Sequence, residues 1–355
     1  MNKTFSCFCF AIPPKMFTKL AAASTQADRH AVRSHLRQSA KLRSLRWELT
    51  PVAAQPGKSK KLRRSIFDME AKEVLPGRLV RSERGKPAKD PAANEAFANL
   101  GVALEFYREV LGWNSVNGRG MDIHAAIHYG AIFRNAMWNG SQMIIGDGDE
   151  TIGGFTAALD IIAHELTHGL TQHLIPAGMG VVRIPVKERE FREQKYALKG
   201  QSGALNESFS DIVGSMVKQW HSRQTVQQAD WLIGEKILAP VLGLAIRSLK
   251  SPGDRKLTWH SDDQMKSMDQ YEEGCDVHDA SGIANHAFYQ AAMKIGGRSW
   301  EKAGPIWFDA YSKLGPQATF EQAAHATIDA ADARFGVRSP ENKAVKAAWR
   351  KVKVI

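Results

Sequence analysis

The sequence predicts an α+β fold with two lobes, a strand-rich lobe followed by a mainly helical one, behind a small helical N-terminal segment. The 355 residues are 43% hydrophobic and 24% charged, which is the composition of a folded globular protein long enough for two or three lobes. Residues 65–154 alternate short apolar runs with Gly and Asn-Gly turns, whereas helical periodicity dominates from residue 159 onward. Strands followed by helices are typical of an α+β arrangement.

Residues 1–64 differ from the rest of the chain in charge. They hold 14 Lys and Arg against 2 Asp and Glu, while the remainder holds 34 against 35. Residues 16–48 carry apolar side chains at helical spacing, and the Pro-, Gly- and Lys-containing residues 50–64 are typical of an exposed linker. A nucleic-acid or membrane-surface arm is the alternative, but the segment lacks the interleaved aromatic residues of a single-strand binder. We therefore expect no nucleic-acid partner.

The later elements follow from the same patterns. One helix, at 94–111, is expected within the strand-rich part. The helical patterns of the second part are 159–172, 204–221, 231–245, 281–296, 299–313, 319–335 and 340–352. No stretch approaches the ~18 uninterrupted apolar residues of a membrane-spanning helix, so we expect no membrane insertion. These boundaries divide the chain into residues 1–64, 65–158 and 159–355.

The N-terminus and the cysteines carry weak signals. The apolar run at 8–12 is short, is followed by two prolines and lacks a clean cleavage site, so a conventional signal peptide is not expected. Cys7, Cys9 and Cys275 are odd in number, and the first two are too close in sequence for an ordinary bridge. No disulfide framework is predicted.

The motif His-Glu-Leu-Thr-His at 164–168 is the strongest chemical signal. Apolar periodicity places it on a helix, where residues four apart lie one above the other. His164 and His168 would then face one metal ion, and Glu165 could face a water molecule bound to it. Two surface histidines on a helix are the alternative if this motif is taken alone.

A second helical motif supplies the expected third ligand. Glu207 and Asp211 also lie four residues apart, on one face of a mostly apolar helix. Two carboxylates buried there need partners, which a metal ion for Glu207 and the N–H of His164 for Asp211 would provide. Two His, one Glu and an open fourth position form a catalytic zinc pattern rather than a structural one. The sequence thus predicts one Zn²⁺.

At this point the chain resembles the thermolysin-like neutral zinc metalloproteases through nearly all of residues 65–355. The resemblance rests on NAMWNG at 135–140, GDGD at 146–149, DWLIGE at 230–235, RSL at 247–249 and VHDASGIANH at 277–286. It implies a two-lobed zincin with the HExxH helix at the floor of the cleft. It also implies that Asn135 and the carbonyl of Ala136 hold the substrate backbone, that Arg247 binds a substrate carbonyl and that His278 stabilises the transition state.

The resemblance implies hydrolysis of peptide and protein substrates. Zn²⁺ lowers the pKa of a bound water to ~7. Glu165 would take the proton of this water and pass it to the leaving amine, and zinc and His278 would stabilise the oxyanion. Cleavage before large hydrophobic residues is implied by the apolar positions that match the family's pocket for the residue after the scissile bond, although these could also be core residues. They are Phe155, Ile161, Ile233, Ile237 and Ile246.

The N-terminus resembles the protealysin-like subgroup, whose short propeptides carry a Pro-Pro motif. Pro13 and Pro14 match that motif, and a turn before a helix is the alternative. The resemblance implies a proenzyme with its own propeptide in the cleft, a monomer, and secretion without an obvious conventional signal peptide, with a cytoplasmic pool left open. A zinc-bound Cys7 or Cys9 in the proform is a further hypothesis.

Three departures from the family are visible. His164 and Glu207 lie 43 positions apart, about twenty more than usual, with the surplus in 174–199. The family's oxyanion-assisting tyrosine aligns with Leu198, so either Tyr196 substitutes or that hydrogen bond is absent. Lys218 replaces a carboxylate of the double-calcium site, which we predict to be lost.

The third departure lies before His278, where Glu-Gly-Cys-Asp at 273–276 replaces the usual Asp-Asn-Gly-Gly. We expect Glu273 to orient His278 in place of the aspartate, and the lost glycine to alter the turn. These departures keep open a second class of function, a catalytically weakened peptide-binding or inhibitor-like member of the same fold.

Overall fold

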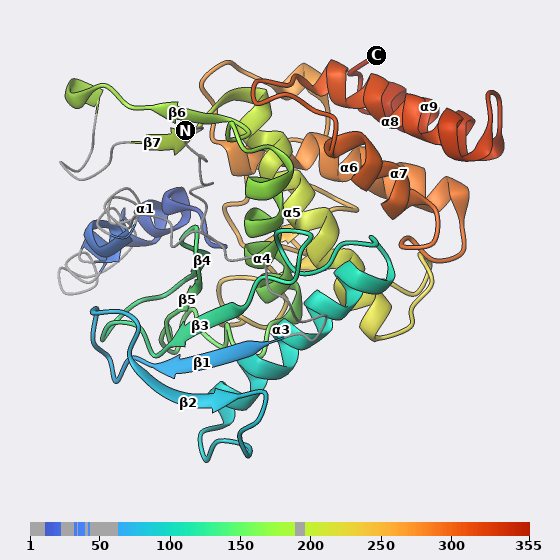
Figure 1. Ribbon diagram of the computed structural model, residues 1–355. Coiled ribbons are helices and arrows are strands. Elements are labelled where there is room, and N and C mark those ends of the chain that lie inside the picture. Colours follow the sequence, from blue (N-terminus) through green and yellow to red (C-terminus); the bar gives the residue numbers. More distant parts are fainter. Residues whose placement is uncertain (1–10, 23–31, 34, 40–41, 43–62, 189–195) are drawn as a thin grey trace.

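The computed structural model describes residues 11–22, 32–33, 35–39, 42, 63–188 and 196–355, and Figure 1 shows their arrangement. A sheet and one long helix form residues 63–158, and helices dominate the part that follows. The expected α+β fold is confirmed. Residues 50–62 of the expected linker, Cys7 and Cys9 lie outside the described residues.

A mixed sheet forms the framework of the first lobe. Its strands lie in the order β2-β1-β3-β5-β4. They are β1 (Arg64–Asp68), β2 (Arg78–Ser82), β3 (Ile123–Ile127), β4 (Ala136–Trp138) and β5 (Met143–Ile145). β1, β3 and β5 run parallel, and β2 and β4 pair antiparallel at the two edges. Every residue of β4 and β5 is buried, and the edge of β4 is covered by the N-terminal segment, where the amide of Ala11 donates to the carbonyl of Ala136 at 3.3 Å.

The helix α3 (Pro91–Glu109) lies between β2 and β3 in the chain and packs between this sheet and the second lobe. Asp90 caps it by accepting from the amide of Ala92, and Pro91 occupies the first turn, where no N–H partner is needed. One face of α3 packs on β1 and another on α4 (Leu159–Leu174). The predicted helix at 94–111 is therefore present and starts one turn earlier.

Two antiparallel-packed central helices, α4 and α5 (Gly200–His221), carry both chemical motifs (Figure 1). They approach closely because Gly214 lies against α4. A Cβ at this glycine would meet the carbonyl oxygen of Asp160 at 2.6 Å. Because the helices are so close, side chains from the two can meet in one buried cluster.

The C-terminal helices cover α5 from the other side. They are α6 (Val277–Ile295), α7 (Ala303–Tyr311), α8 (Phe320–Phe335) and α9 (Pro340–Lys351). Thr319 and Gln322 form a capping box on α8, and Ser339 with Pro340 starts α9. These helices match the patterns expected from the sequence to within about a turn.

The helix predicted at 231–245 is wrong. The segment instead forms β8 (Leu232–Ile233), a series of turns, and pairing with β9 (Arg247–Ser248). Trp231, Gly234, Lys236 and Gly243 all have positive φ, which a right-handed helix cannot contain. Trp231, Ile233 and Ile237 point into the core from this turn-rich loop, whereas Val241 and Leu244 are exposed, so the helical spacing does not reflect one buried helix face.

The long segment between α4 and α5 is partly described. It contains β6 (Val181–Arg183), the short 3-10 helix η1 (Val186–Glu188) and β7 (Tyr196–Leu198). β6 and β7 form a separate antiparallel pair, with Arg183 opposite Tyr196. A further 3-10 helix, η2 (Met268–Gln270), precedes α6.

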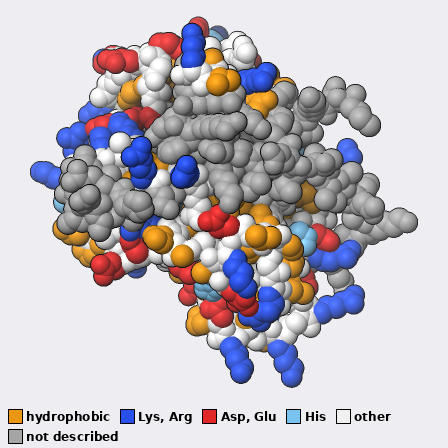
Figure 2. Space-filling model, turned by 90° about the vertical axis from the view of Figure 1, so that its left-hand side faces the viewer, with side chains coloured by type: hydrophobic (Ala, Val, Ile, Leu, Met, Phe, Trp, Pro, Cys, Tyr) orange, Lys and Arg blue, Asp and Glu red, His pale blue; other side chains and the backbone are white. Residues whose placement is uncertain are grey.

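The described N-terminal residues pack onto the body of the protein. They include α1 (Pro14–Ala22) and helical residues within 32–42. Ile12, Met16 and Phe17 are fully buried in the same hydrophobic cluster that contains the core of both lobes. In the part of the chain described, no helix is long and apolar enough to span a membrane. On the face in Figure 2, basic and acidic side chains of the described residues are interspersed.

Candidate active site and metal centre

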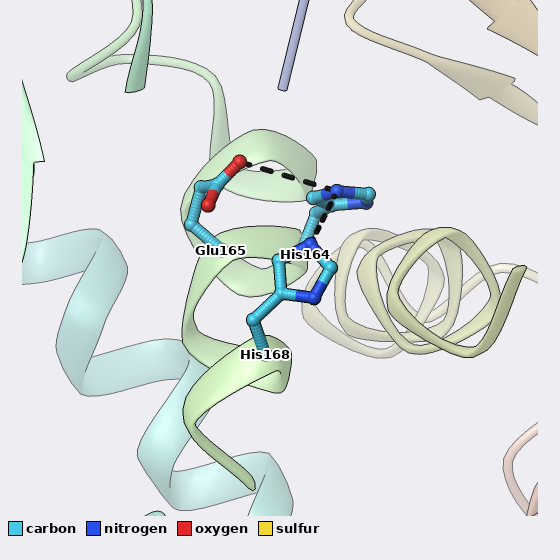
Figure 3. A group of neighbouring side chains, drawn as sticks. All are labelled: His164, Glu165 and His168. Carbon is cyan, nitrogen blue, oxygen red and sulfur yellow. Dashed lines mark hydrogen bonds and ion pairs between the residues drawn. The ribbon is translucent and has the colours of Figure 1, made fainter. Parts of the chain in front are cut away.

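The centre of the molecule holds a buried cluster of polar side chains on α4. His164 and His168 lie one turn apart, and their Nε2 atoms are 3.1 Å from each other (Figure 3). The two rings are nearly perpendicular, with an interplanar angle of 86°. Glu165 is rotated away from the line of the histidines, as Figure 3 shows, and all three side chains are buried. The helix thus places two imidazole nitrogens side by side and a carboxylate apart from them.

The helix α5 brings Glu207 to the same point. Glu207 Oε2 lies 3.4 Å from His164 Nε2, and Oε1 lies 3.9 Å from His168 Nε2. Among the described residues, neither carboxylate oxygen of Glu207 has a hydrogen-bond partner, although both are buried. A buried carboxylate without a donor requires another source of positive charge.

The geometry of this cluster fits a zinc ion. Zinc binds nitrogen and oxygen at 2.0–2.2 Å, so the ligand atoms of a tetrahedral site lie about 3.3 Å apart. The separation of the two histidine nitrogens, 3.1 Å, is close to that value, and the unpartnered oxygens of Glu207 complete a His-His-Glu donor set. Glu165 also lies near, with its nearest ligand atom 4.0 Å from His164 Nε2, but Glu207 is closer at 3.4 Å and has both oxygens unpartnered among the described residues.

The carboxylate of Asp211 lies behind the ring of His164. Asp211 Oδ1 is 2.9 Å from His164 Nδ1, and the same carboxylate receives Arg247 through two nitrogens, at 2.9 and 2.7 Å, and Asn285 Nδ2 at 2.9 Å. Burial opposes the ionised form of Asp211, but Arg247 and His164 lower its pKa to about 2. The geometry brings Asp211 and His164 together as the sequence predicted, and it adds Arg247 and Asn285 to the same network.

Opposing influences act on the titration of His164. Burial alone would lower the pKa of its ring, but Asp211 and Glu207 outweigh burial and raise the pKa to about 10. A zinc ligand must be the neutral imidazole, so metal binding here displaces a proton.

Two residues next to His168 were missed by the sequence reasoning. Asn206 Oδ1 lies 3.1 Å and Ser210 Oγ 3.2 Å from His168 Nδ1. Both stand beside Glu207 and Asp211 on α5, so the helical period places them on the face that meets α4. The helical period of this segment is therefore the sequence feature that indicates Asn206 and Ser210. Ser and Asn in a buried helix need a partner, and Nδ1 of His168, which faces away from the ring of His164, provides one.

Glu165 has the properties of a general base. Burial raises the pKa of its carboxyl group to about 7, against the lowering effects of His168 and His164. The amide of Trp138, in β4, donates to Glu165 Oε2 at 2.9 Å, and Oε1 has no hydrogen-bond partner among the described residues. One oxygen is therefore held in place while the other can accept a proton.

The ring of His278 enters the cluster from α6. Its Nε2 lies 3.5 Å from Glu207 Oε2, and its Nδ1 lies 2.8 Å from Asp276 Oδ1. Burial would lower the pKa of His278, but Glu207 and Asp276 raise it to about 9. The expectation that Glu273 orients this histidine is wrong. Glu273 is exposed and accepts from the hydroxyl of Tyr271, because the turn before α6 directs it outward.

The described end of the N-terminal segment lies against the residues predicted to bind substrate. The amide of Ala11 donates to the carbonyl of Ala136 at 3.3 Å, and Arg247 Nη1 donates to the carbonyl of Ala11 at 3.0 Å. Asn135 forms two bonds with the backbone of Ile12, one to its amide and one to its carbonyl, each 3.0 Å long. Pro13 accepts from the amide of Met16 and begins the turn into α1.

The remaining predicted residues are placed as follows. The five apolar positions proposed for a substrate pocket are all buried within the main hydrophobic cluster; they are Phe155, Ile161, Ile233, Ile237 and Ile246. Tyr196 is half-buried in β7 and points to the same side of the strand as Leu198. Lys218 lies on α5 near its C-terminal end, beside Asp230 and Asp160.

Comparison with known proteins agrees with this geometry. Residues 56–172 match the thermolysin metallopeptidase catalytic domain, and residues 195–354 match the thermolysin metallopeptidase alpha-helical domain. An extracellular metalloprotease of Pectobacterium carotovorum subsp. carotovorum is 42% identical over 92% of this chain and 91% of its own length. The chain belongs to the thermolysin family of metallopeptidases.

Other relatives identify the subgroup. The protease PrtS of a Photorhabdus strain is 36% identical over 82% of this chain and 76% of its own length. The solved precursor of protealysin, a metalloproteinase from Serratia proteamaculans, is 35% identical and covers 98% of this chain and 100% of its own, with a TM-score of 0.82. This protein is thus a protealysin-like, thermolysin-family zinc metalloendopeptidase with the organisation of a proenzyme, as the sequence predicted.

Proposed function

We propose that residues 11–22 of this thermolysin-family precursor occupy the place of a substrate and keep the enzyme inactive until the chain is cut. The supporting observation is the backbone pairing of Ala11 and Ile12. The three groups that bind it, Asn135, the carbonyl of Ala136 and Arg247, are those expected to bind a substrate backbone. A segment held by the same groups excludes substrate from them.

The catalytic roles proposed for the exposed enzyme follow from the cluster. His164, His168 and Glu207 hold the zinc ion, which when bound supplies an activated water and a Lewis acid. Glu165 takes a proton from the attacking water and passes it to the leaving amine. His278 donates to the oxyanion as charge develops there. Asp211 keeps the Nδ1 proton of His164 in place, so that Nε2 remains a ligand.

Ion pairs supplement the backbone contacts of the N-terminal segment. Lys15 Nζ lies 2.6 Å from Asp263 and 2.5 Å from Asp279, and Lys19 Nζ lies 2.5 Å from the same oxygen of Asp263. These pairs are partly exposed, so each contributes little alone, but they join the basic N-terminal segment to acidic residues of the catalytic part. These ion pairs support the proposal that charge pairing, in addition to the burial of apolar side chains, holds the N-terminal segment in one place.

Cutting the linker should activate the enzyme. We expect a full-length protein carrying an inserted protease site between residues 50 and 60 to cleave a quenched Gly-Leu peptide slowly before the cut and rapidly after it. Activity should disappear with 1,10-phenanthroline. The cut belongs before Arg63, because Arg64 opens β1 and its guanidinium donates to Glu83 and to the carbonyl of Phe97. The proposed domain boundary after residue 64 would remove these contacts.

Two matched variants test whether the docked segment causes latency. Asp263→Asn, which weakens the pairs with Lys15 and Lys19, should raise the activity of the uncut chain. Asp269→Asn, which removes a surface pair with Lys353, should not. Equal activity before and after the cut would reject the inhibitory role. A cut protein that retains zinc but cleaves no peptide would instead favour the weakened, peptide-binding alternative.

We further propose cleavage before large hydrophobic residues, with Tyr196 as the oxyanion helper in place of the family's tyrosine. The apolar character of the five pocket positions supports the first part. Comparing kcat/KM for peptides with Leu, Phe, Ala or Asp after the scissile bond tests it, and equal values for Leu and Asp would refute it. An unchanged kcat in Tyr196→Phe would remove Tyr196 from the mechanism.

We propose that the ammonium group of Lys218 takes the place of the family's double-calcium site. Lys218 Nζ lies 2.9 Å from Asp230 Oδ1 and 2.8 Å from the carbonyl of Leu232, with Asp160 at 3.6 Å. Burial opposes the charged ammonium, but Asp160 and Asp230 raise the pKa of Lys218, so it stays charged.

We therefore expect the melting temperature to be the same in EGTA and in millimolar calcium. Lys218→Glu should lower it in EGTA and regain part of the loss with calcium, because binding to the folded state alone stabilises it. The matched variant Lys346→Glu should respond to neither condition. Equilibrium dialysis that finds two tightly bound calcium ions in the unaltered protein would contradict this proposal.

The place of action is proposed from the relatives. The Pectobacterium protein is named an extracellular metalloprotease, and we propose that this enzyme also acts outside the cell as a monomer, with a cytoplasmic pool of the proform. Detecting the protein in culture medium and in cells tests the location. Size-exclusion chromatography with light scattering gives the molar mass of the protein in solution and tests whether it is a monomer.

A further inference from the structure

The carboxylate that faces His278 comes from an unexpected position. Asp276 Oδ1 accepts from the backbone amide of His278 and lies equally close, 2.8 Å, to its ring Nδ1. Asp276 is also the N-cap of α6, with the extended φ and ψ of −65° and 133°. One side chain therefore starts the helix and holds the ring of its second residue.

The turn before α6 explains why Asp276 rather than Glu273 makes this contact. Gly274 has a φ of +85°, and the amide of Cys275 donates to the carbonyl of Glu272 at 3.2 Å. This tight turn leaves Glu273 exposed, where it accepts from the hydroxyl of Tyr271. It also places Asp276 at the N-cap of α6. Where the family usually has glycine, this chain has a carboxylate.

The other nitrogen of the same ring points into the zinc-binding cluster. His278 Nε2 is buried, is 3.5 Å from Glu207 and has no hydrogen-bond partner among the described residues. The side chain of His278 is 9% exposed and α6 is packed on α5, so the ring has few alternative orientations. Holding Nδ1 therefore determines where the Nε2 donor lies.

We propose that Asp276 is the positioning residue of His278, so that in this chain the orienting carboxylate has moved from five residues before the histidine to two residues before it. The inference rests on the proposed catalytic role of His278. The altered turn therefore still provides a carboxylate that orients His278. An active enzyme is expected from this arrangement, and a weakened one is not.

The test compares variants of the cut, zinc-loaded enzyme. Asp276→Gly should lower kcat about 10–100-fold and change KM less than about twofold, because the lost interaction acts in the transition state. Asp276→Ser keeps an N-cap and should keep the melting temperature of the unaltered protein, yet it should lose kcat to a similar extent. Glu273→Gln should retain full kcat.

A spectroscopic measurement separates positioning from capping. In ¹H–¹⁵N spectra of histidine-labelled enzyme, the Nδ1 proton of His278 should be protected from exchange in the unaltered protein and unprotected in Asp276→Ser. Full kcat in folded Asp276→Ser, or a loss of kcat in Glu273→Gln alone, would overturn the proposal. If the unaltered enzyme cleaves no peptide, the proposed function fails, and the exchange of this proton still decides whether Asp276 holds the ring.

Discussion

Replacing Glu165 by glutamine should lower kcat about 10²–10⁴-fold while zinc remains bound in a one-to-one ratio. The amide has nearly the shape of the carboxyl group, and its oxygen can still accept from the amide of Trp138, as Glu165 Oε2 does at 2.9 Å. It cannot accept the proton of water at Oε1. The metal ligands on α4 and α5 are unchanged, so the defect should be confined to proton transfer.

Three measurements on one preparation check this result: kcat with a quenched peptide, zinc content by mass spectrometry, and the melting temperature. Glu109→Gln, an exposed glutamate of α3, is the matched control and should change none of them. A Glu165→Gln enzyme with more than about a tenth of the original kcat would show that another group accepts the proton, and the proposed role would be withdrawn.

The strength of the sequence signal at this site has a physical reason. The spacings 164–168 and 207–211 are local, and a regular helix converts each into a pair of side chains on one face without reference to the rest of the fold. The meeting of the two helices is not local, but buried carboxylates restrict it, because few partners for Glu207 and Asp211 exist in an apolar interior. Asn206 and Ser210 could have been found by the same argument.

Two predictions fail because the backbone conformation, and not the spacing or alignment of the residues, determines the structure there. At 231–245 the apolar spacing was helical, but Gly234 and Gly243 stand at positive φ and indicated turns. Before His278, alignment by position pointed to Glu273, whereas the direction of that side chain depends on a turn centred on Gly274. Side-chain direction after a glycine turn depends on φ and ψ values that residue types alone do not determine.

The N-terminal contacts show a different limit. The Pro-Pro motif predicted a segment in the cleft, but the residues that pair with Asn135, Ala136 and Arg247 are the two before the prolines. Proline has no amide proton and cannot pair through its nitrogen. Its place just after the paired residues is consistent with a role in turning the chain into α1, where Pro13 accepts from the amide of Met16.

The second large effect is expected at the third zinc ligand. Glu207→Gln should weaken zinc binding by more than about 100-fold, because it removes the only anionic member of the His-His-Glu set, and loss of a residue that merely supports a ligand already costs about 10–100-fold. Asp211→Asn should fall within that smaller range. The order should reverse for stability. Asp211→Asn should lose more stability than Glu207→Gln, because Asp211 also pairs with the buried Arg247 at 2.7 Å.

This difference separates metal binding from folding. Breaking a buried ion pair typically costs about 3–5 kcal/mol, so zinc-free Asp211→Asn should melt well below the zinc-free unaltered protein. In zinc-free Glu207→Gln, the rings of His164 and His278 lose one anionic neighbour, but these contacts are longer, 3.4 and 3.5 Å, than the 2.7 Å pair of Asp211 with Arg247, so we expect a smaller loss. Competition with a fluorescent zinc chelator gives the affinities, and thermal melting of the dialysed proteins gives the stabilities. Unchanged zinc affinity in Glu207→Gln would exclude Glu207 as a ligand, and the unpartnered oxygens between His164 and His168 would then need a different explanation.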